Sequence, residues 1–230
     1  MKEKILIVDD DADNRELINI LEPNTNECIV YMLDVSGHGV PAAMVSLAVY
    51  QSLQTKTGLI TKQSLSSSIE QPTASISPKN VLEALDKEYP MERFNKYFSI
   101  SYLVVNSKES SVTYCNAGHP PPLILHPDGY IERMEKGGTI IGMNGIVSFE
   151  EEQKKLHTGD RVIMYTDGVT EFQNAREEIY GEKNFHLLLH DTKDLPVDKM
   201  LDEVMNSLLQ FGNNTPLKDD VSLLAFEFKG

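Results

Sequence analysis

Three groups of aspartates stand beside short apolar segments in this chain of 230 residues. Asp34 and Asp167 each follow such a segment, and the pair Asp219 and Asp220 precedes one. Apolar runs of this length predict buried strands, and a strand end holds a side chain firmly enough for catalysis or metal binding. Carboxylates that converge repel one another at neutral pH, and a hard divalent cation such as Mg²⁺ or Mn²⁺ relieves this repulsion. Two such cations can together activate a water molecule for attack on phosphorus.

Each of these aspartates, taken alone, also suits a plain turn. Asp-Gly is a turn dipeptide, because the aspartate side chain hydrogen-bonds to nearby backbone groups. One motif by itself therefore favours the turn interpretation. The three motifs together, in this order, reverse that preference and predict a metal site.

Composition restricts the kinds of partner. The chain has 21 basic and 35 acidic side chains, a net charge of −14, and 40% apolar residues. This is a soluble globular composition, and its acidity argues against nucleic acid or an anionic membrane as a partner. No apolar run is long enough to cross a bilayer, and the N-terminus lacks the apolar core of a signal peptide. We therefore expect a cytoplasmic protein, with Cys28 and Cys115 as buried thiols or, alternatively, as one disulfide.

The elements that would position the aspartates follow from hydrophobic periodicity. A strand, a turn and a helix are expected over residues 26–56. Pro41 suits the first turn of that helix, and Val40, Met44 and Leu47 share one of its faces. Residues 57–78 are rich in Ser, Thr and Gln and predict a surface loop or flap.

The remainder of the chain changes period. A helix capped by Ser77 and ended by Pro90 is expected first. From residue 98 onward short strands alternate with turns, and HPDGY is a strong hairpin signal. Two amphipathic helices and a strand at 221–228 complete the chain. This order predicts an α+β fold of two antiparallel sheets packed face to face, with helices on the outside.

Five segments carry a family resemblance. They are DVSGHGVPAAM, NAGHPPPLIL, GGTIIGM, GDRVIMYTDGVTE and KDDVSLL, spread over about residues 24 to 229. In order and spacing they resemble the motifs of PPM-class, metal-dependent serine/threonine phosphatases of the SpoIIE-like bacterial branch. The resemblance implies a PPM-type α-β-β-α sandwich over 23–230 that lacks part of its first strand. It also implies a two-metal site and hydrolysis of phosphoserine or phosphothreonine by a metal-activated water.

Residue roles follow by position. Asp34 resembles the aspartate that bridges both metals, and Val35 would offer its backbone carbonyl to the second metal. Asp167 and Asp219 resemble the remaining ligands of the first metal, with Asp220 supporting them. The resemblance therefore gives Asp34, Asp167 and Asp219 as the catalytic residues, because they hold the Mn²⁺ or Mg²⁺ ions.

One family ligand has no direct counterpart. The family carries a further metal aspartate in a GGD sequence ahead of the bridging aspartate, and no GGD occurs in this chain. Counting back by the family's spacing reaches Glu16, whose side chain is one methylene longer. Asp13 and the cluster at 9–11 are alternatives. Without a replacement, the second metal binds weakly and hydrolysis is poor.

The first residues resemble a different family. KILIVDDDADNREL is similar to the opening of a response-regulator receiver domain, with a strand, paired acids and the first helix. The phospho-accepting strand of that family is absent from the sequence. We interpret 1–22 as the remnant of a receiver start in a fusion that lost its middle. From Ile18 onward, the alternative is the strand–turn–strand lead-in of the phosphatase itself.

The histidines carry weaker signals. His38 could be a ligand or an acid–base group. His119, within NAGH, is expected to shape the site rather than to bind metal. The other four are expected at the surface or on helices: His126, His157, His186 and His190.

Two functions remain open from sequence. The first is a protein phosphatase whose substrate, by the resemblance, is an anti-anti-sigma-type (STAS) protein in a partner-switching or two-component pathway. The second is a catalytically weak phosphatase fold that binds such a partner without turnover. The sequence leaves a homodimer open.

Overall fold

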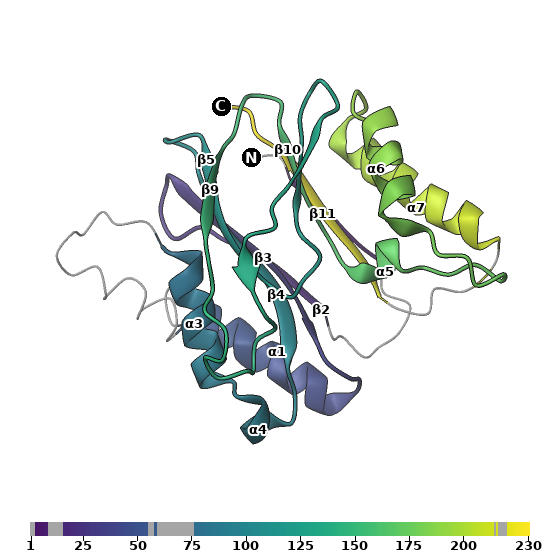
Figure 1. The fold of residues 1–230 in the computed structure, drawn as a ribbon. Coiled ribbons are helices and arrows are strands. Elements are labelled where there is room, and N and C mark those ends of the chain that lie inside the picture. Colours follow the sequence, from purple (N-terminus) through teal and green to yellow (C-terminus); the bar gives the residue numbers. More distant parts are fainter. Residues whose placement is uncertain (1–2, 9–15, 55–57, 59–75, 214, 216–219) are drawn as a thin grey trace. The chain divides into compact units, whose positions relative to one another are not determined.

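The computed structural model describes residues 3–8, 16–54, 58, 76–213, 215 and 220–230. Its strands form one sheet of five and one of six strands, with helices beside each sheet (Figure 1). The predicted α+β fold of two sheets with flanking helices is confirmed. The chain divides into a central unit (13–119 and 135–156) and a terminal unit (1–12, 120–134 and 157–230). No helix in the described ranges is long and apolar enough to cross a membrane.

The six-stranded sheet belongs to the central unit. Its order is β2-β3-β4-β5-β8, and β9 also pairs with β5. The strands are β2 (Glu16–Leu21), β3 (Glu27–Val35), β4 (Phe98–Asn106), β5 (Ser111–Ala117), β8 (Gly137–Gly138) and β9 (Glu152–Lys155).

Alternation along β3 separates the two faces of this sheet. Ile29, Tyr31, Leu33 and Val35 are buried in one cluster with residues of α1 (Val40–Leu53) and α3 (Pro78–Glu88). Successive strand residues point to opposite faces, so Asp34 lies on the other face. Helices α1 and α3 thus cover the face that carries no candidate ligand (Figure 1).

Helix α1 does not use the apolar face that its sequence suggests. Val40, Met44 and Leu47 share one face as expected, but they are 73%, 66% and 56% exposed. The packing face consists of smaller or β-branched residues such as Ala42 and Val49, both fully buried. The helix is apolar on both sides, so periodicity alone does not identify the buried one.

Helix α3 begins and ends where the sequence predicts. Ser77 Oγ accepts a hydrogen bond from Asn80 N at 3.2 Å, which caps the first turn. The helix stops before Pro90, and the short α4 (Met91–Phe94) follows. Asn95, in the left-handed conformation with φ 50°, then turns the chain into β4.

The five-stranded sheet belongs to the terminal unit. Its order is β1-β11-β10-β6-β7. The strands are β1 (Glu3–Val8), β6 (Leu123–Leu125), β7 (Ile131–Arg133), β10 (Arg161–Tyr165) and β11 (Val221–Glu227). Helices α6 (Gly181–Asp191) and α7 (Val197–Gly212) pack on it, and Met200 and Met205 are buried in the shared core as predicted.

The beginning of the chain joins both sheets. Strand β1 pairs antiparallel with β11, from Glu3 opposite Phe226 to Val8 opposite Val221. Residues 16–21 form β2 against β3, so the expected receiver-type helix in this segment is wrong. The alternative lead-in of strand, turn and strand fits the structure. The acidic cluster at 9–11 and the expected loop, apart from Gly58 and residues 76–78, lie outside the described residues.

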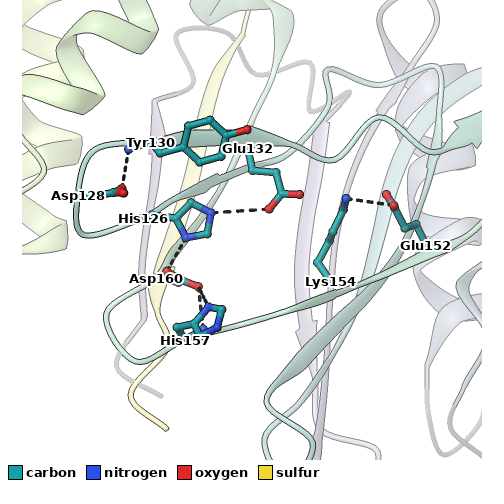
Figure 2. A network of polar contacts seen from close by, with 8 residues as sticks. All are labelled: His126, Asp128, Tyr130, Glu132, Glu152, Lys154, His157 and Asp160. Atoms are coloured by element: carbon teal, nitrogen blue, oxygen red, sulfur yellow. Dashed lines mark hydrogen bonds and ion pairs between the residues drawn. The ribbon is translucent and has the colours of Figure 1, made fainter.

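The turn predicted at Thr158-Gly159-Asp160 is anchored by a buried carboxylate (Figure 2). Asp160 is fully buried, and its Oδ2 accepts a hydrogen bond from His157 N at 2.7 Å. Its Oδ1 lies 2.8 Å from His126 Nδ1, and His126 Nε2 lies 3.7 Å from Glu132 Oε2. His126 is therefore part of a polar network that ties the β6–β7 hairpin to the start of β10, and its expected surface role was too simple.

Both cysteines are buried free thiols, which confirms the first alternative and excludes the disulfide. Burial raises the pKa of Cys115 to about 12. This thiol therefore stays protonated and unreactive at physiological pH.

Candidate active site

Asp34 stands at the last but one position of β3 and is half-buried. The antiparallel register places residue 16 of β2 and Ser99 of β4 directly opposite Asp34. Opposite positions in an antiparallel pair share a sheet face. The position reached by counting back along the sequence, Glu16, is thus Asp34's neighbour in the register.

The turn after Asp34 is held by a reciprocal pair of hydrogen bonds. Ser36 N donates to Tyr97 O at 2.9 Å, and Tyr97 N donates to Ser36 Oγ at 3.0 Å. The pairing of β3 and β4 therefore continues past Val35. This fixes the backbone on both sides of Val35, whose carbonyl is a predicted metal ligand.

Gly37 continues this turn under two constraints. Its φ is +79°, a conformation that other residues rarely adopt, and an added Cβ would collide with Lys96 Nζ. Gly39 O then accepts hydrogen bonds from Ala42 N and Ala43 N at 3.0 and 3.2 Å. These bonds begin α1, with Pro41 in its first turn as predicted.

His119 lies beside Ser99 in the same unit. Its Nδ1 is 2.8 Å from Ser99 Oγ, and its Nε2 is buried without a partner in the described part of the chain. Burial lowers the pKa of His119 to about 3. The imidazole is therefore neutral at pH 7 and cannot serve there as a cationic acid.

Asn116 holds the NAGH segment in place. Its Oδ1 accepts from Ser101 Oγ at 2.9 Å and from His119 N at 3.2 Å. Its Nδ2 donates to His119 O at 2.6 Å. These contacts agree with a shaping role for His119, as the sequence suggests.

In the terminal unit, Asp167 opens the short helix α5 (Asp167–Thr170) directly after β10. Thr166, just before it, binds the start of β11 through three hydrogen bonds. Thr166 N donates to Ser222 O at 3.1 Å, Thr166 Oγ1 donates to Asp220 O at 3.1 Å, and Ser222 N donates to Thr166 Oγ1 at 3.0 Å. The end of β10 and the start of β11 thus form one fixed unit of backbone.

Gly168 makes this junction tighter. A Cβ at residue 168 would collide with the carbonyl oxygen of Asp220. Only glycine allows the two backbones to approach so closely. Asp167 therefore lies near the chain segment that contains Asp219 and Asp220.

The structure thus assembles the predicted ligands in two groups. Asp34, Val35 and the backbone of residue 16 belong to the central unit, whereas Asp167 and Asp220 belong to the terminal unit. Asp219 lies outside the described residues. Within the described ranges, no cluster of three or more His, Cys, Asp or Glu side chains forms a metal site. The predicted donors are carboxylates and one carbonyl, the oxygen ligands that suit Mg²⁺ or Mn²⁺.

Asp86 is a buried acid that the sequence analysis missed. This α3 residue is 2% exposed, and its carboxylate accepts three backbone hydrogen bonds. Gly142 N and Met143 N donate to Oδ1 at 2.7 and 2.8 Å, and Gly145 N donates to Oδ2 at 2.5 Å. The available signal was an acid on the buried face of α3, next to Leu85.

Comparisons with known proteins give this geometry a family. Residues 24–229 match the family model of stage II sporulation protein E, SpoIIE. Phosphoserine phosphatase RsbP of Bacillus subtilis (strain 168) is 25% identical over 184 residues, which make up 78% of this chain and 40% of RsbP. Phosphoserine phosphatase RsbU of the same organism is 23% identical over 202 residues, 87% of this chain and 55% of RsbU.

A solved structure supports the fold. The SiaA-PP2C domain of Pseudomonas aeruginosa has a TM-score of 0.77, with 17% identity over 99% of this chain and 86% of that one. The chain spans between 20% and 55% of the length of the curated relatives that it matches.

The comparisons also bear on the N-terminal residues. Neither the family match, which begins at residue 24, nor the relatives support the receiver resemblance of residues 1–15. With the family match covering most of its length and its two sheets arranged as in a PP2C domain, the chain belongs to the SpoIIE family.

Proposed function

We propose that this chain is a metal-dependent protein phosphatase that hydrolyses phosphoserine or phosphothreonine. The observation that carries the proposal is the placement of acids at rigid strand ends. Asp34 has residue 16 opposite it, and Asp167 is bound through Thr166 to the start of β11. The family membership and the phosphoserine phosphatase relatives supply the reaction.

In this proposal, Asp34, Asp167, Asp219 and the Val35 carbonyl hold two Mg²⁺ or Mn²⁺ ions, with Glu16 completing the second site. The ions, when bound, neutralise charge on the phosphoryl group and acidify the attacking water. The protein's part is to keep the ligands in place. The Ser36–Tyr97 pair and the Thr166–Ser222 bonds do this on the two sides, so little ordering is needed when substrate arrives.

The proposed substrate is a phosphorylated anti-anti-sigma-type (STAS) protein, as the family resemblance implies. Such a protein would be a partner in a partner-switching pathway. The test is to compare a phosphorylated STAS domain with a phosphopeptide of the same local sequence. A higher kcat/KM for the folded domain is expected, because its surface supplies binding energy that a peptide lacks.

Asp34→Asn tests the reaction itself. Asparagine keeps the shape but removes the charge, so Mn²⁺-dependent hydrolysis of an aryl phosphate should fall at least about a hundredfold. Asp194→Asn is the matched control, because Asp194 is 84% exposed and pairs only with Lys193 among the described residues. Unchanged hydrolysis in Asp34→Asn would refute the proposed function.

The second candidate function is a phosphoprotein-binding module with little turnover. It is favoured by one observation, the glutamate at the position opposite Asp34, where the family carries aspartate. The triple change Asn14→Gly, Arg15→Gly and Glu16→Asp restores the family's GGD sequence. If the second metal is the weak point, this variant should bind Mn²⁺ more tightly by calorimetry and hydrolyse aryl phosphate faster. Equal metal affinity and equal turnover would show that residue 16 does not limit the site.

A further inference from the structure

Lys96 is the cation nearest to the turn that follows Asp34 among the side chains that contact Gly37. Its Nζ occupies the space where a side chain at Gly37 would begin. The residue is half-buried, and Nζ makes no hydrogen bond or ion pair with any residue in the described part of the chain. A partly buried ammonium without a protein partner is costly, so an anion that binds there is favoured.

The backbone fixes this position. Asn95 turns the chain after α4, and Tyr97 pairs with Ser36 through two hydrogen bonds. Val35 is opposite Phe98 in the ladder, and continuing that register through Ser36 and Tyr97 brings Lys96 opposite Gly37. Lys96 is therefore placed by the same two strands that place Asp34.

A neighbouring cation is already engaged elsewhere. The guanidinium of Arg93 lies over the ring of Phe94, 5.0 Å from its centroid. The chain as a whole has a net charge of −14, which repels a phosphate dianion. A local positive charge beside the turn is thus needed to draw a phosphoryl group to this face of the sheet.

We propose that Lys96 binds the phosphoryl group of the substrate at the turn Ser36–Gly37. The proposal rests on the proposed phosphatase function, and it adds a substrate-binding residue to the metal ligands. A lysine ammonium is a point charge without the planar geometry of arginine. It therefore attracts any phosphate monoester dianion and does not distinguish phosphoserine from an aryl phosphate.

The test measures phosphate binding directly. Inorganic phosphate is titrated by calorimetry into Mn²⁺-saturated wild type, Lys96→Met, Lys96→Arg and Lys108→Met. Lys108 is the matched control, because it is exposed in the turn at the far end of β4. We expect Lys96→Met to weaken phosphate binding about tenfold or more, Lys96→Arg to recover most of it, and Lys108→Met to match wild type.

Steady-state kinetics give the second readout. In Lys96→Met, the KM for an aryl phosphate should rise in proportion to the loss of phosphate affinity, and for a phosphopeptide by the same factor. Urea unfolding of each variant checks the fold, and Lys96→Gln replaces Lys96→Met if the latter does not fold. A Lys96→Met protein that binds phosphate as tightly as wild type overturns the proposal, as does a wild type that binds none.

Two outcomes separate this inference from others. If Lys96 only offsets the charge of Asp34, Lys96→Met will bind Mn²⁺ more tightly with unchanged phosphate affinity, which overturns the inference. If wild type binds phosphate through Lys96 but hydrolyses no ester, the inference stands and the proposed hydrolysis fails. If wild type hydrolyses esters and Lys96→Met does so with the same KM, the hydrolysis stands and the inference fails.

Discussion

His119 shows how a single residue can be held in one protonation state. Its ring is 5% exposed, and no charged partner contributes to the lowering of its pKa to about 3. The hydrogen-bond distance to Ser99 Oγ and the bonds from Asn116 fix the ring and its backbone. A neutral donor–acceptor pair, Ser99 and His119, therefore lies next to Asp34 in the register instead of an additional charge.

This protonation state predicts a pH-dependent stability. The unfolded chain protonates His119 near its ordinary pKa of 6.5, whereas the folded chain does so only near 3. Stability from this residue is thus fully present above pH 6.5 and is lost as the pH falls toward 3, by up to about 1.4 kcal/mol per pH unit. Urea unfolding between pH 4 and 8 should show a shallower slope for His119→Asn than for wild type.

The control for this measurement is His190→Asn, because the side chain of His190 is 53% exposed. It should keep the wild-type slope. An unchanged slope in His119→Asn would mean that the buried imidazole does not set the acid sensitivity of the fold.

Residue identity predicted part of the site and not the rest. Asp34, Val35 and Asp167 stand out because an acidic or turn sequence follows an apolar strand, and such patterns are local. Asp86 and Lys96 do not stand out, because their roles depend on partners far away in sequence, at 142–145 and at Gly37. A lysine before a strand is an ordinary solvated residue until the register places it against a turn.

At the scale of elements, α3 and the loop at 142–147 act together. The loop presents Ile146 and Val147, which are 78% and 45% exposed, and its backbone donors converge on Asp86. Gly142 O in turn accepts a hydrogen bond from Met91 N at 3.0 Å, and Phe98 pairs with Ile141. The loop is thereby connected to α4 and to the beginning of β4, the segment that carries Lys96.

Removing the carboxylate of Asp86 should loosen this connection. Asp86→Ala leaves three backbone N–H groups without their acceptor, so we expect a loss of about 2–4 kcal/mol in the free energy of unfolding. Asp86→Asn keeps one acceptor oxygen and should lose less. Glu88→Gln, an exposed change on the same helix, is the control for urea unfolding. A loss in Asp86→Ala no larger than in this control would contradict the anchoring role.

Element types were predictable where the signals were complete. Ser77 and the two prolines gave α3, and HPDGY gave the hairpin of β6 and β7, in which His126 N donates to Tyr130 O at 2.9 Å. Residues 16–21 were open to two interpretations, because ELINIL has no strict alternation and its strand form depends on pairing with β3. The exposed face of α1 was not predictable, since both sides of that helix are apolar.

For the whole molecule, the long-range pairing of strands was beyond the sequence. Strands β9 and β10 flank the same turn region, yet β9 pairs in the six-stranded sheet and β10 in the five-stranded one. Local patterns fix strands and turns, but they do not assign neighbouring strands to different sheets. The family resemblance was needed for the two-sheet arrangement, and the solved PP2C domain agrees with it.

Metal binding should stabilise the whole fold. Acids from distant parts of the chain form the proposed site only when it is folded, so Mn²⁺ binds the native state in preference to the unfolded one. At a free Mn²⁺ concentration of about 100 Kd this adds about 2.7 kcal/mol, which raises the Tm by about 5–10 °C for a chain of this size. Thermal unfolding with Mn²⁺ and with EDTA measures the shift.

Asp34→Asn should lose most of this shift, and Asp194→Asn should retain it. The stabilisation by Mn²⁺ is independent of turnover, so it also applies if the chain proves to be a binding module. An equal rise in the Tm of Asp34→Asn would place the cation elsewhere in the molecule.

The reciprocal bonds between Ser36 and Tyr97 have a consequence for motion. Both amide protons are engaged although they belong to a turn at the surface, next to the exposed Gly37 and His38. They should therefore exchange with deuterated solvent on the slow timescale of core strands, while the amides of Gly37 and His38, for which no hydrogen bond is found among the described residues, exchange quickly. Slow exchange at this turn in the metal-free protein would mean that the binding loop is already rigid before any cation or phosphoprotein arrives.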